Sequence, residues 1–106
     1  MEQRRTRRFK LQLPLSITRS GAERMALAGF TRNISSNGVL FTMEREPDLT
    51  GPIEYIITLN SDGSQQVNLR CIGKVIRAER LEEGVSTLPA YQVAATLERY
   101  EFVREP

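Results

Sequence analysis

The feature that most constrains the fold of this chain is a period-two alternation of apolar and polar residues, which recurs along most of its 106 residues. Successive side chains of a strand point to opposite faces, so this spacing places the apolar residues on one buried face of a sheet. Six such runs occur, at residues 11–17, 26–30, 39–43, 53–59, 67–75 and 93–97. No helical run is long enough for a helix that connects parallel strands. The pattern therefore predicts an all-β barrel or sandwich.

The segments between these runs carry turn and loop signals. Pro14 interrupts the first run, which predicts an edge position or the start of a strand. Residues 60–64 (Asn-Ser-Asp-Gly-Ser) predict a hairpin connection, and residues 82–89 an exposed loop. For the tail, residues 98–105, we expect a short helix or an irregular segment whose aromatic side chains dock onto the fold.

The charge is unevenly distributed. The net charge is only +2, but residues 4–10 (Arg-Arg-Thr-Arg-Arg-Phe-Lys) hold five of the 15 basic residues, and the remainder is close to neutral or slightly acidic. We therefore expect two parts: residues 1–10 as a flexible arginine-rich arm and residues 11–106 as one β-barrel domain. A local positive patch then matters more than the overall charge.

Missing residue types exclude several kinds of chemistry. The chain has no histidine, so Ser-His and Cys-His nucleophile pairs are excluded, and one cysteine cannot build the usual zinc site. Cys71 lies in the apolar register of its run, which predicts a buried, inert thiol. We expect no enzymatic activity, metal or cofactor. The absence of a signal peptide and of a long apolar run favours a cytoplasmic protein without membrane insertion.

Two segments carry chemistry suited to a ligand. Arginine donates two parallel hydrogen bonds to phosphate or to a guanine edge, and its flat face stacks on a base. Taken alone, residues 4–8 are equally well explained as a solvated basic tail. Residues 33–38 (Asn-Ile-Ser-Ser-Asn-Gly) offer amide and hydroxyl groups, but by themselves they indicate an ordinary hairpin turn.

The two segments together resemble the motifs of the PilZ family. Arg4 and Arg8 match an R-x-x-x-R arm, and Asn33, Ser35 and Gly38 match an N-x-S-x-x-G turn; the resemblance extends over essentially the whole chain. It implies a six-stranded antiparallel split barrel that binds the bacterial second messenger cyclic di-GMP. Control of motility or biofilm formation is a further implication that no residue of the chain specifies.

The resemblance also implies roles for the individual residues. Arg4 and Arg8 would contact phosphate and guanine, while Arg5 and Arg7 add positive charge that attracts the ligand. The arm would fold onto the ligand when it binds, and this ordering would transmit the signal to a downstream effector protein.

In the turn, Asn33 would accept a hydrogen bond from a guanine N–H group, and the Ser35 hydroxyl would bond to guanine or phosphate. Gly38 would keep the turn tight beneath the ligand, and as a glycine it could supply a positive φ or permit close backbone approach. Other family members often carry Asp in place of Asn33. A neutral amide is a weaker acceptor, which we expect to tune the affinity.

Two alternatives stay open. One is a PilZ-fold protein-interaction module that does not bind the nucleotide. The other is a barrel for single-stranded nucleic acid, which would need aromatic stacking platforms on a basic strand surface. With only seven aromatic residues and a basic cluster confined to the arm, we do not expect a nucleic acid polymer as partner.

Overall fold

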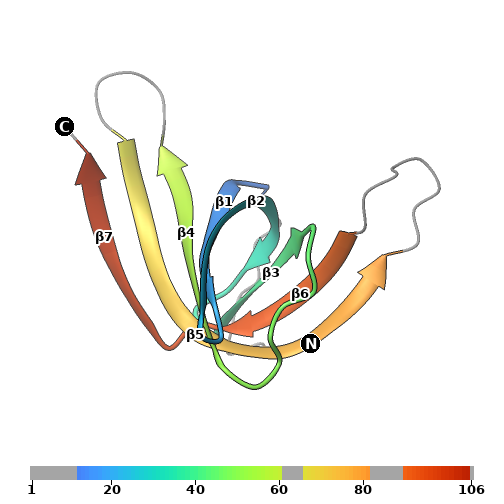
Figure 1. Ribbon diagram of the computed structural model, residues 1–106. Coiled ribbons are helices and arrows are strands. Elements are labelled where there is room, and N and C mark those ends of the chain that lie inside the picture. Colours follow the sequence, from blue (N-terminus) through green and yellow to red (C-terminus); the bar gives the residue numbers. More distant parts are fainter. Residues whose placement is uncertain (1–11, 61–65, 82–89, 106) are drawn as a thin grey trace, which may run out of the picture.

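A computed structural model describes residues 12–60, 66–81 and 90–105, and every regular element in these ranges is a strand (Figure 1). The strands are β1 (Pro14–Ser20), β2 (Glu23–Ile34), β3 (Gly38–Met43), β4 (Pro52–Asn60), β5 (Gln66–Leu81), β6 (Ala90–Thr96) and β7 (Arg99–Glu105). Within these ranges no helix could cross a membrane. Of the turn predicted at 60–64, Asn60 is the last residue of β4 and residues 61–64 lie outside the described residues, as does the predicted loop at 82–89.

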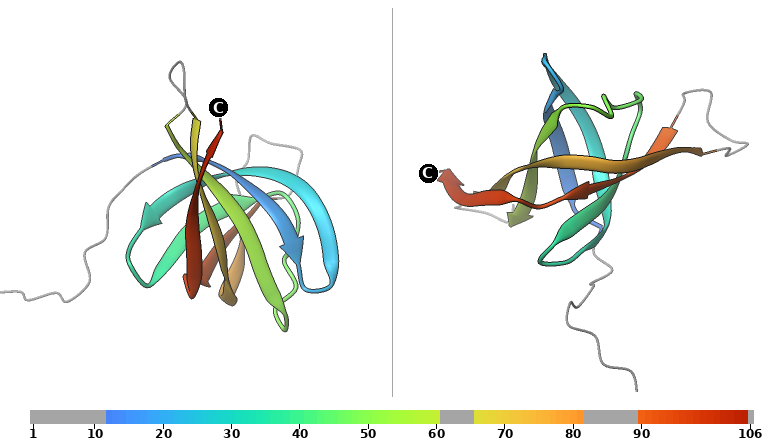
Figure 2. Two further views of the ribbon diagram at one scale, coloured as in Figure 1. Left: turned by 90° about the vertical axis from the view of Figure 1, so that its left-hand side faces the viewer. Right: turned by 90° about the horizontal axis from the view of Figure 1, so that it is seen from below.

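The strands form one antiparallel sheet in the order β4-β1-β2-β3-β6-β5-β7, and an additional β4–β5 pairing closes the first six into a barrel. The closure depends on the length of β5, which has 16 residues. Its first half pairs with β4 and its second half with β6, so β5 curves along one end of the barrel (Figures 1 and 2). The predicted six-stranded antiparallel barrel is confirmed, and β7 is an addition to it.

The core follows the predicted alternation. Alternate residues of β1, β3, β4, β5 and β6 are buried, and the Phe41 and Tyr55 rings meet with centroids 5.4 Å apart. The fully buried large side chains are Ile17, Phe41, Met43, Ile53, Tyr55, Ile57, Cys71 and Val93, together with Thr31. Cys71 is buried, as predicted, and this burial raises the pKa of its thiol to about 12.

The second strand is longer than predicted. β2 spans 12 residues and includes the predicted segment 26–30, in which exposed and partly buried residues alternate. Ala26, Ala28 and Phe30 are exposed, whereas Met25 and Leu27 pack against the core. The predicted register of this run, with Ala26, Ala28 and Phe30 on the buried face, is therefore wrong, and the opposite set of residues faces the core.

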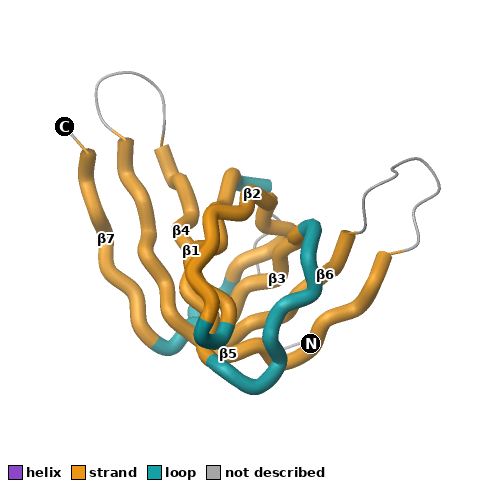
Figure 3. Tube along the Cα trace, viewed as in Figure 1, coloured by secondary structure: helices purple, strands orange, loops and turns teal. Residues whose placement is uncertain are grey.

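The C-terminal segment corrects two expectations. Instead of a short helix, residues 99–105 form β7, which pairs with β5 from Ile72↔Arg99 to Gln66↔Glu105 (Figure 3). β6 ends at Thr96 and leaves this stretch of β5 with an open edge, so β7 supplies partners for its backbone groups. The aromatic rings do not dock onto the barrel, since Tyr100 is 59% and Phe102 64% exposed.

Candidate ligand-binding site

The turn between β2 and β3 is held together by one buried hydroxyl group. Ser35 Oγ accepts hydrogen bonds from the backbone N–H groups of Asn37 and Gly38, both at 3.2 Å, and donates to the Gly38 carbonyl at 3.3 Å. The Ser35 N–H also donates to the Gly38 carbonyl at 2.9 Å. Ser35 therefore shapes the turn from within, in the manner of serine-based turns.

Gly38 is required by the neighbouring strand. A Cβ atom at this position would lie 2.8 Å from the carbonyl oxygen of Ala95 on β6. Its φ is not positive, so the expected left-handed conformation is absent and the expected close backbone approach is confirmed. The glycine lets the end of the hairpin lie against β6.

Asn33 follows an irregularity in β2. The pairing with β3 shifts register between Thr31 and Asn33, so Arg32 is the extra residue of a bulge. A bulge bends its strand and redirects the side chains next to it, and such features are frequent beside binding sites. Arg32 is exposed and Asn33 is half-buried.

The start of the described chain lies beside this bulge. The Leu13 N–H donates to Thr31 Oγ1 at 2.9 Å, and the Thr31 N–H donates to the Leu13 carbonyl at 2.9 Å. These bonds bring the chain that follows the arginine-rich segment to a point two residues before Asn33. Arg4, Arg5, Arg7 and Arg8 themselves lie outside the described residues.

A hollow at the same place contains residues that sequence reasoning missed. It has a volume of about 420 Å³ and is lined by Gln12, Phe30, Thr31, Arg32 and Thr42. Phe30, which is 49% exposed, and the exposed Arg32 offer an aromatic face and a positive charge. The sequence does place Arg32 directly before the N-x-S-x-x-G motif, which could have marked it as a candidate. Only the bulge in β2 shows that Arg32 lines this hollow.

The turn is connected to the segment between β6 and β7. The Leu97 N–H donates to the Asn37 carbonyl at 2.9 Å, and the Glu98 N–H donates to the Ile72 carbonyl at 3.0 Å. We call residues 96–98 the junction. It joins the hairpin turn on one side to β5 and β7 on the other.

Thr96 anchors the junction. Its Oγ1 atom accepts a hydrogen bond from the Lys74 N–H at 2.8 Å and donates to the Glu98 carboxylate at 2.9 Å. The Tyr55 hydroxyl donates to the Thr96 carbonyl at 3.3 Å from the core. Gly73 permits this packing, because a Cβ atom there would lie 1.8 Å from the Thr96 carbonyl oxygen.

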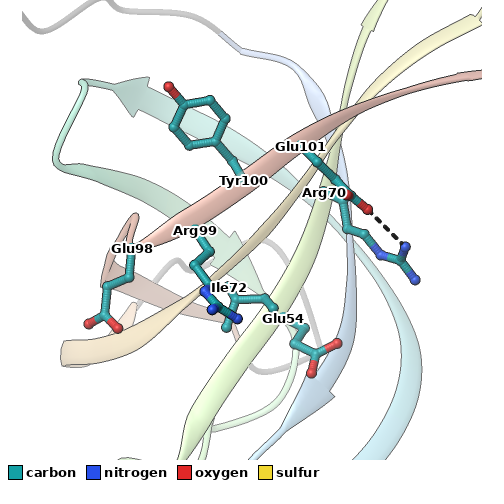
Figure 4. A pocket seen from close by; sticks show the side chains of 7 residues that line it. All are labelled: Glu54, Arg70, Ile72, Glu98, Arg99, Tyr100 and Glu101. Atoms are coloured by element: carbon teal, nitrogen blue, oxygen red, sulfur yellow. Dashed lines mark hydrogen bonds and ion pairs between the residues drawn. The ribbon is translucent and has the colours of Figure 1, made fainter.

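A second hollow lies elsewhere, on the outer face of β4, β5 and β7 (Figure 4). Its volume is about 640 Å³, and its charged lining includes the Arg70–Glu101 ion pair at 3.2 Å. It contains none of the residues of the turn. Among the described residues no group of three or more His, Cys, Asp or Glu side chains could hold a metal ion.

A comparison with known protein families agrees with the barrel, with the arginine-rich N-terminal segment and with the Ser35 turn. Residues 2–102 match the family described as PilZ domain. The chain belongs to the PilZ family. The match covers nearly the whole chain and includes both motifs. Neither the curated proteins nor the solved structures contain a match.

Membership in the PilZ family confirms the predicted resemblance. PilZ domains are known as binding and receptor domains. In this PilZ domain the bulge, the serine-held turn and the entry of the chain at Leu13 meet at one end of β2. This end is the candidate ligand-binding site.

Proposed function

We propose that this PilZ domain binds cyclic di-GMP at the end of β2, between the arginine-rich arm and the turn at residues 33–38. The observation that carries the proposal is the pair of hydrogen bonds between Leu13 and Thr31. Because only four residues separate Arg8 from Leu13, the chain can reach Asn33 without a long connection. The two motifs thus belong to one site.

The ligand chemistry fits these residues. Cyclic di-GMP carries two phosphates and two guanines, and Arg4 and Arg8 pair with the phosphates and with guanine edges or faces. Asn33 accepts from a guanine N–H group. Arg5 and Arg7 raise the positive potential that attracts the ligand.

The turn residues receive a narrower role in this proposal. The Ser35 hydroxyl already bonds to three backbone groups of the turn, so we assign it to holding Asn33 and the turn backbone in place. Gly38 keeps the hairpin against β6. Phe30 and Arg32 extend the site toward the hollow beside Leu13.

The hydrogen bond from Leu97 to Asn37 supports a route for the signal. A ligand that pulls on the turn also acts on the junction, and through the junction on β7. We therefore propose that binding changes both the arm and the surface around β7, which a downstream effector contacts.

The second candidate function is a PilZ-fold interaction module that binds no nucleotide. One observation favours it: Tyr100 and Phe102 form an exposed aromatic pair on β7, far along the chain from the arm. Such a pair is suited to protein contact whether or not the nucleotide binds.

Isothermal titration calorimetry with cyclic di-GMP tests the proposal. We expect saturable heat with the wild type and none with Arg8→Ala. Arg24→Ala is the matched control, because this exposed arginine lies at the opposite end of β2 from the turn, and it should bind normally. GTP and a short oligonucleotide should give no comparable heat.

Absence of heat with the wild type, at ligand concentrations well above the micromolar range, would reject the nucleotide proposal and favour the interaction module. Equal losses in Arg8→Ala and Arg24→Ala would show that general charge, and not the arm, attracts the ligand.

A further inference from the structure

β7 is the last strand of the sheet order, and β5 is its one neighbour among the described strands. Its outer edge therefore presents backbone N–H and C=O groups that no described strand pairs with. An open edge of this kind favours pairing with a further strand. β7 has seven residues, which is long enough for a regular ladder.

The barrel-side face of β7 continues the hydrophobic core into solvent. Directly opposed residues form two rows across β1, β4, β5 and β7: Leu15, Ile57, Leu69 and Phe102 in one, Ile17, Tyr55, Cys71 and Tyr100 in the other. Exposure along the first row rises from 9% at Leu69 to 64% at Phe102. The barrel wall turns away at β5, so nothing described covers the last member of either row.

The two faces of β7 differ in character. Tyr100 and Phe102 meet edge to face on one side, with ring centroids 6.3 Å apart. Arg99 and Glu101 lie on the other side, toward the charged hollow, and Tyr100 points away from them (Figure 4). The strand thus has an aromatic face that ends at Arg104, an opposite face with Arg99 and Glu101, and an open edge.

We propose that β7 pairs antiparallel with β7 of a second copy of this chain, about a two-fold axis that passes at Phe102. A two-fold axis perpendicular to the sheet keeps the aromatic faces of both copies on the same side. In this register Phe102 faces Phe102 of the second copy, and Tyr100 faces the guanidinium of Arg104. Glu101 faces Val103, so no like charges oppose each other in these pairs.

A two-fold axis one residue earlier in β7 would be less favourable. Moving the axis to Glu101 would set two glutamates directly opposite each other, which destabilises an antiparallel pair. The centred register also extends the apolar rows across the axis and covers both aromatic pairs. This self-complementarity favours a second copy over an unrelated strand.

The contact area is limited to one strand and its aromatic face, so we infer a weak dimer that forms with increasing concentration. Two-fold pairing uses the outer edge of β7 in both copies, and therefore closes at two. The inference does not depend on the nucleotide proposal, because it concerns the purified protein without ligand.

Sedimentation velocity over a concentration series tests the pairing. We expect the wild type to dimerise, and Phe102→Glu and Phe102→Lys each to weaken the dimer by about ten-fold or more, since each sets like charges opposite one another at the axis. An equimolar mixture of these two variants should dimerise again, because glutamate then faces lysine. Ile76→Glu is the control, since Ile76 is 65% exposed on β5 and should leave dimerisation unchanged.

A wild type that stays monomeric throughout the series overturns the proposal. A mixture of Phe102→Glu and Phe102→Lys that remains monomeric rejects the two-fold axis at Phe102. An equal effect of Ile76→Glu would assign the association to general surface hydrophobicity. Phe102 is largely exposed, so unchanged circular dichroism should accompany each substitution.

Discussion

At the scale of single residues, side chains that sequence reasoning treats alike have different uses. Ser35 and Ser36 are adjacent hydroxyls, yet Ser35 bonds within the turn backbone while the Ser36 hydroxyl donates to Asn37 Oδ1 at 3.3 Å. Cys71 and Tyr55 both carry a titratable group into the core, and desolvation raises the pKa of each. Burial therefore decides the chemistry of these groups.

Cys71 links stability to alkaline pH. The thiol ordinarily has a pKa of 9.0 but about 12 in the folded protein, so folding favours the protonated form. Its contribution is fully present below pH 9.0 and is lost as the pH rises toward 12. Between these values we expect urea unfolding to show that the wild type loses about 1.4 kcal/mol per pH unit more than Cys71→Ala. Desolvation, the main cause of the raised pKa of Tyr55, is present in both proteins, and only the smaller contribution that Cys71 makes to it is lost with the thiol. Equal slopes would contradict the assignment.

At the scale of elements, the junction connects β7 to several other parts of the barrel. It receives hydrogen bonds from β4 through Tyr55 and from β5 through Lys74, and it donates one to the hairpin turn at Asn37. β7 begins directly after it. The position of β7 therefore depends on side chains from several strands as well as on its own pairing with β5.

Thr96→Val should loosen β7. The substitution removes the hydroxyl that accepts from the Lys74 N–H and donates to Glu98, and we expect a loss of about 1 kcal/mol of unfolding free energy. Hydrogen exchange should become faster at Leu97 and throughout β7, while β3 keeps its protection. Thr58→Val on β4 is the control. Unchanged exchange in β7 would show that the ladder with β5 alone positions the strand.

At the scale of the whole molecule, charge is divided between two parts of opposite sign. Residues 1–10 contain five basic residues and one acidic residue, a net charge of +4, which leaves −2 for residues 11–106 out of the total of +2. An anionic ligand is therefore attracted to one end of the chain and not to the molecule in general.

Under the proposed function, this division predicts a salt-sensitive affinity. Raising the ionic strength from about 0.1 M to 1 M shortens the Debye length from about 10 Å to about 3 Å, and calorimetry should show cyclic di-GMP binding weakened by about ten-fold or more. The double variant Arg5→Ala/Arg7→Ala should bind with a smaller salt dependence, because it removes charge that attracts the ligand at a distance. An unchanged salt dependence in this variant would place Arg5 and Arg7 outside the attracting field.

Much of the fold followed from the sequence, because a period of two directly encodes which side chains share a face of a sheet. Phe41, Tyr55 and Cys71 were predicted in the core and are buried. Pro14 was predicted to mark an edge position or the start of a strand, and it is the first residue of β1. The arm and the turn pointed to the PilZ family through residue types and spacing, which are properties of the linear chain.

Tertiary structure decided the features that depend on partners distant in the chain. Residues 99–105 form a strand because β6 pairs only with the second half of β5, so the same edge of the first half is open for β7. The sequence of residues 99–105 does not contain that information. Gly38 and Gly73 are required by the carbonyl oxygens of Ala95 and Thr96, and not by their own φ. Tyr100 and Phe102 are apolar at core-like spacing, yet they remain exposed because the barrel wall turns away from them.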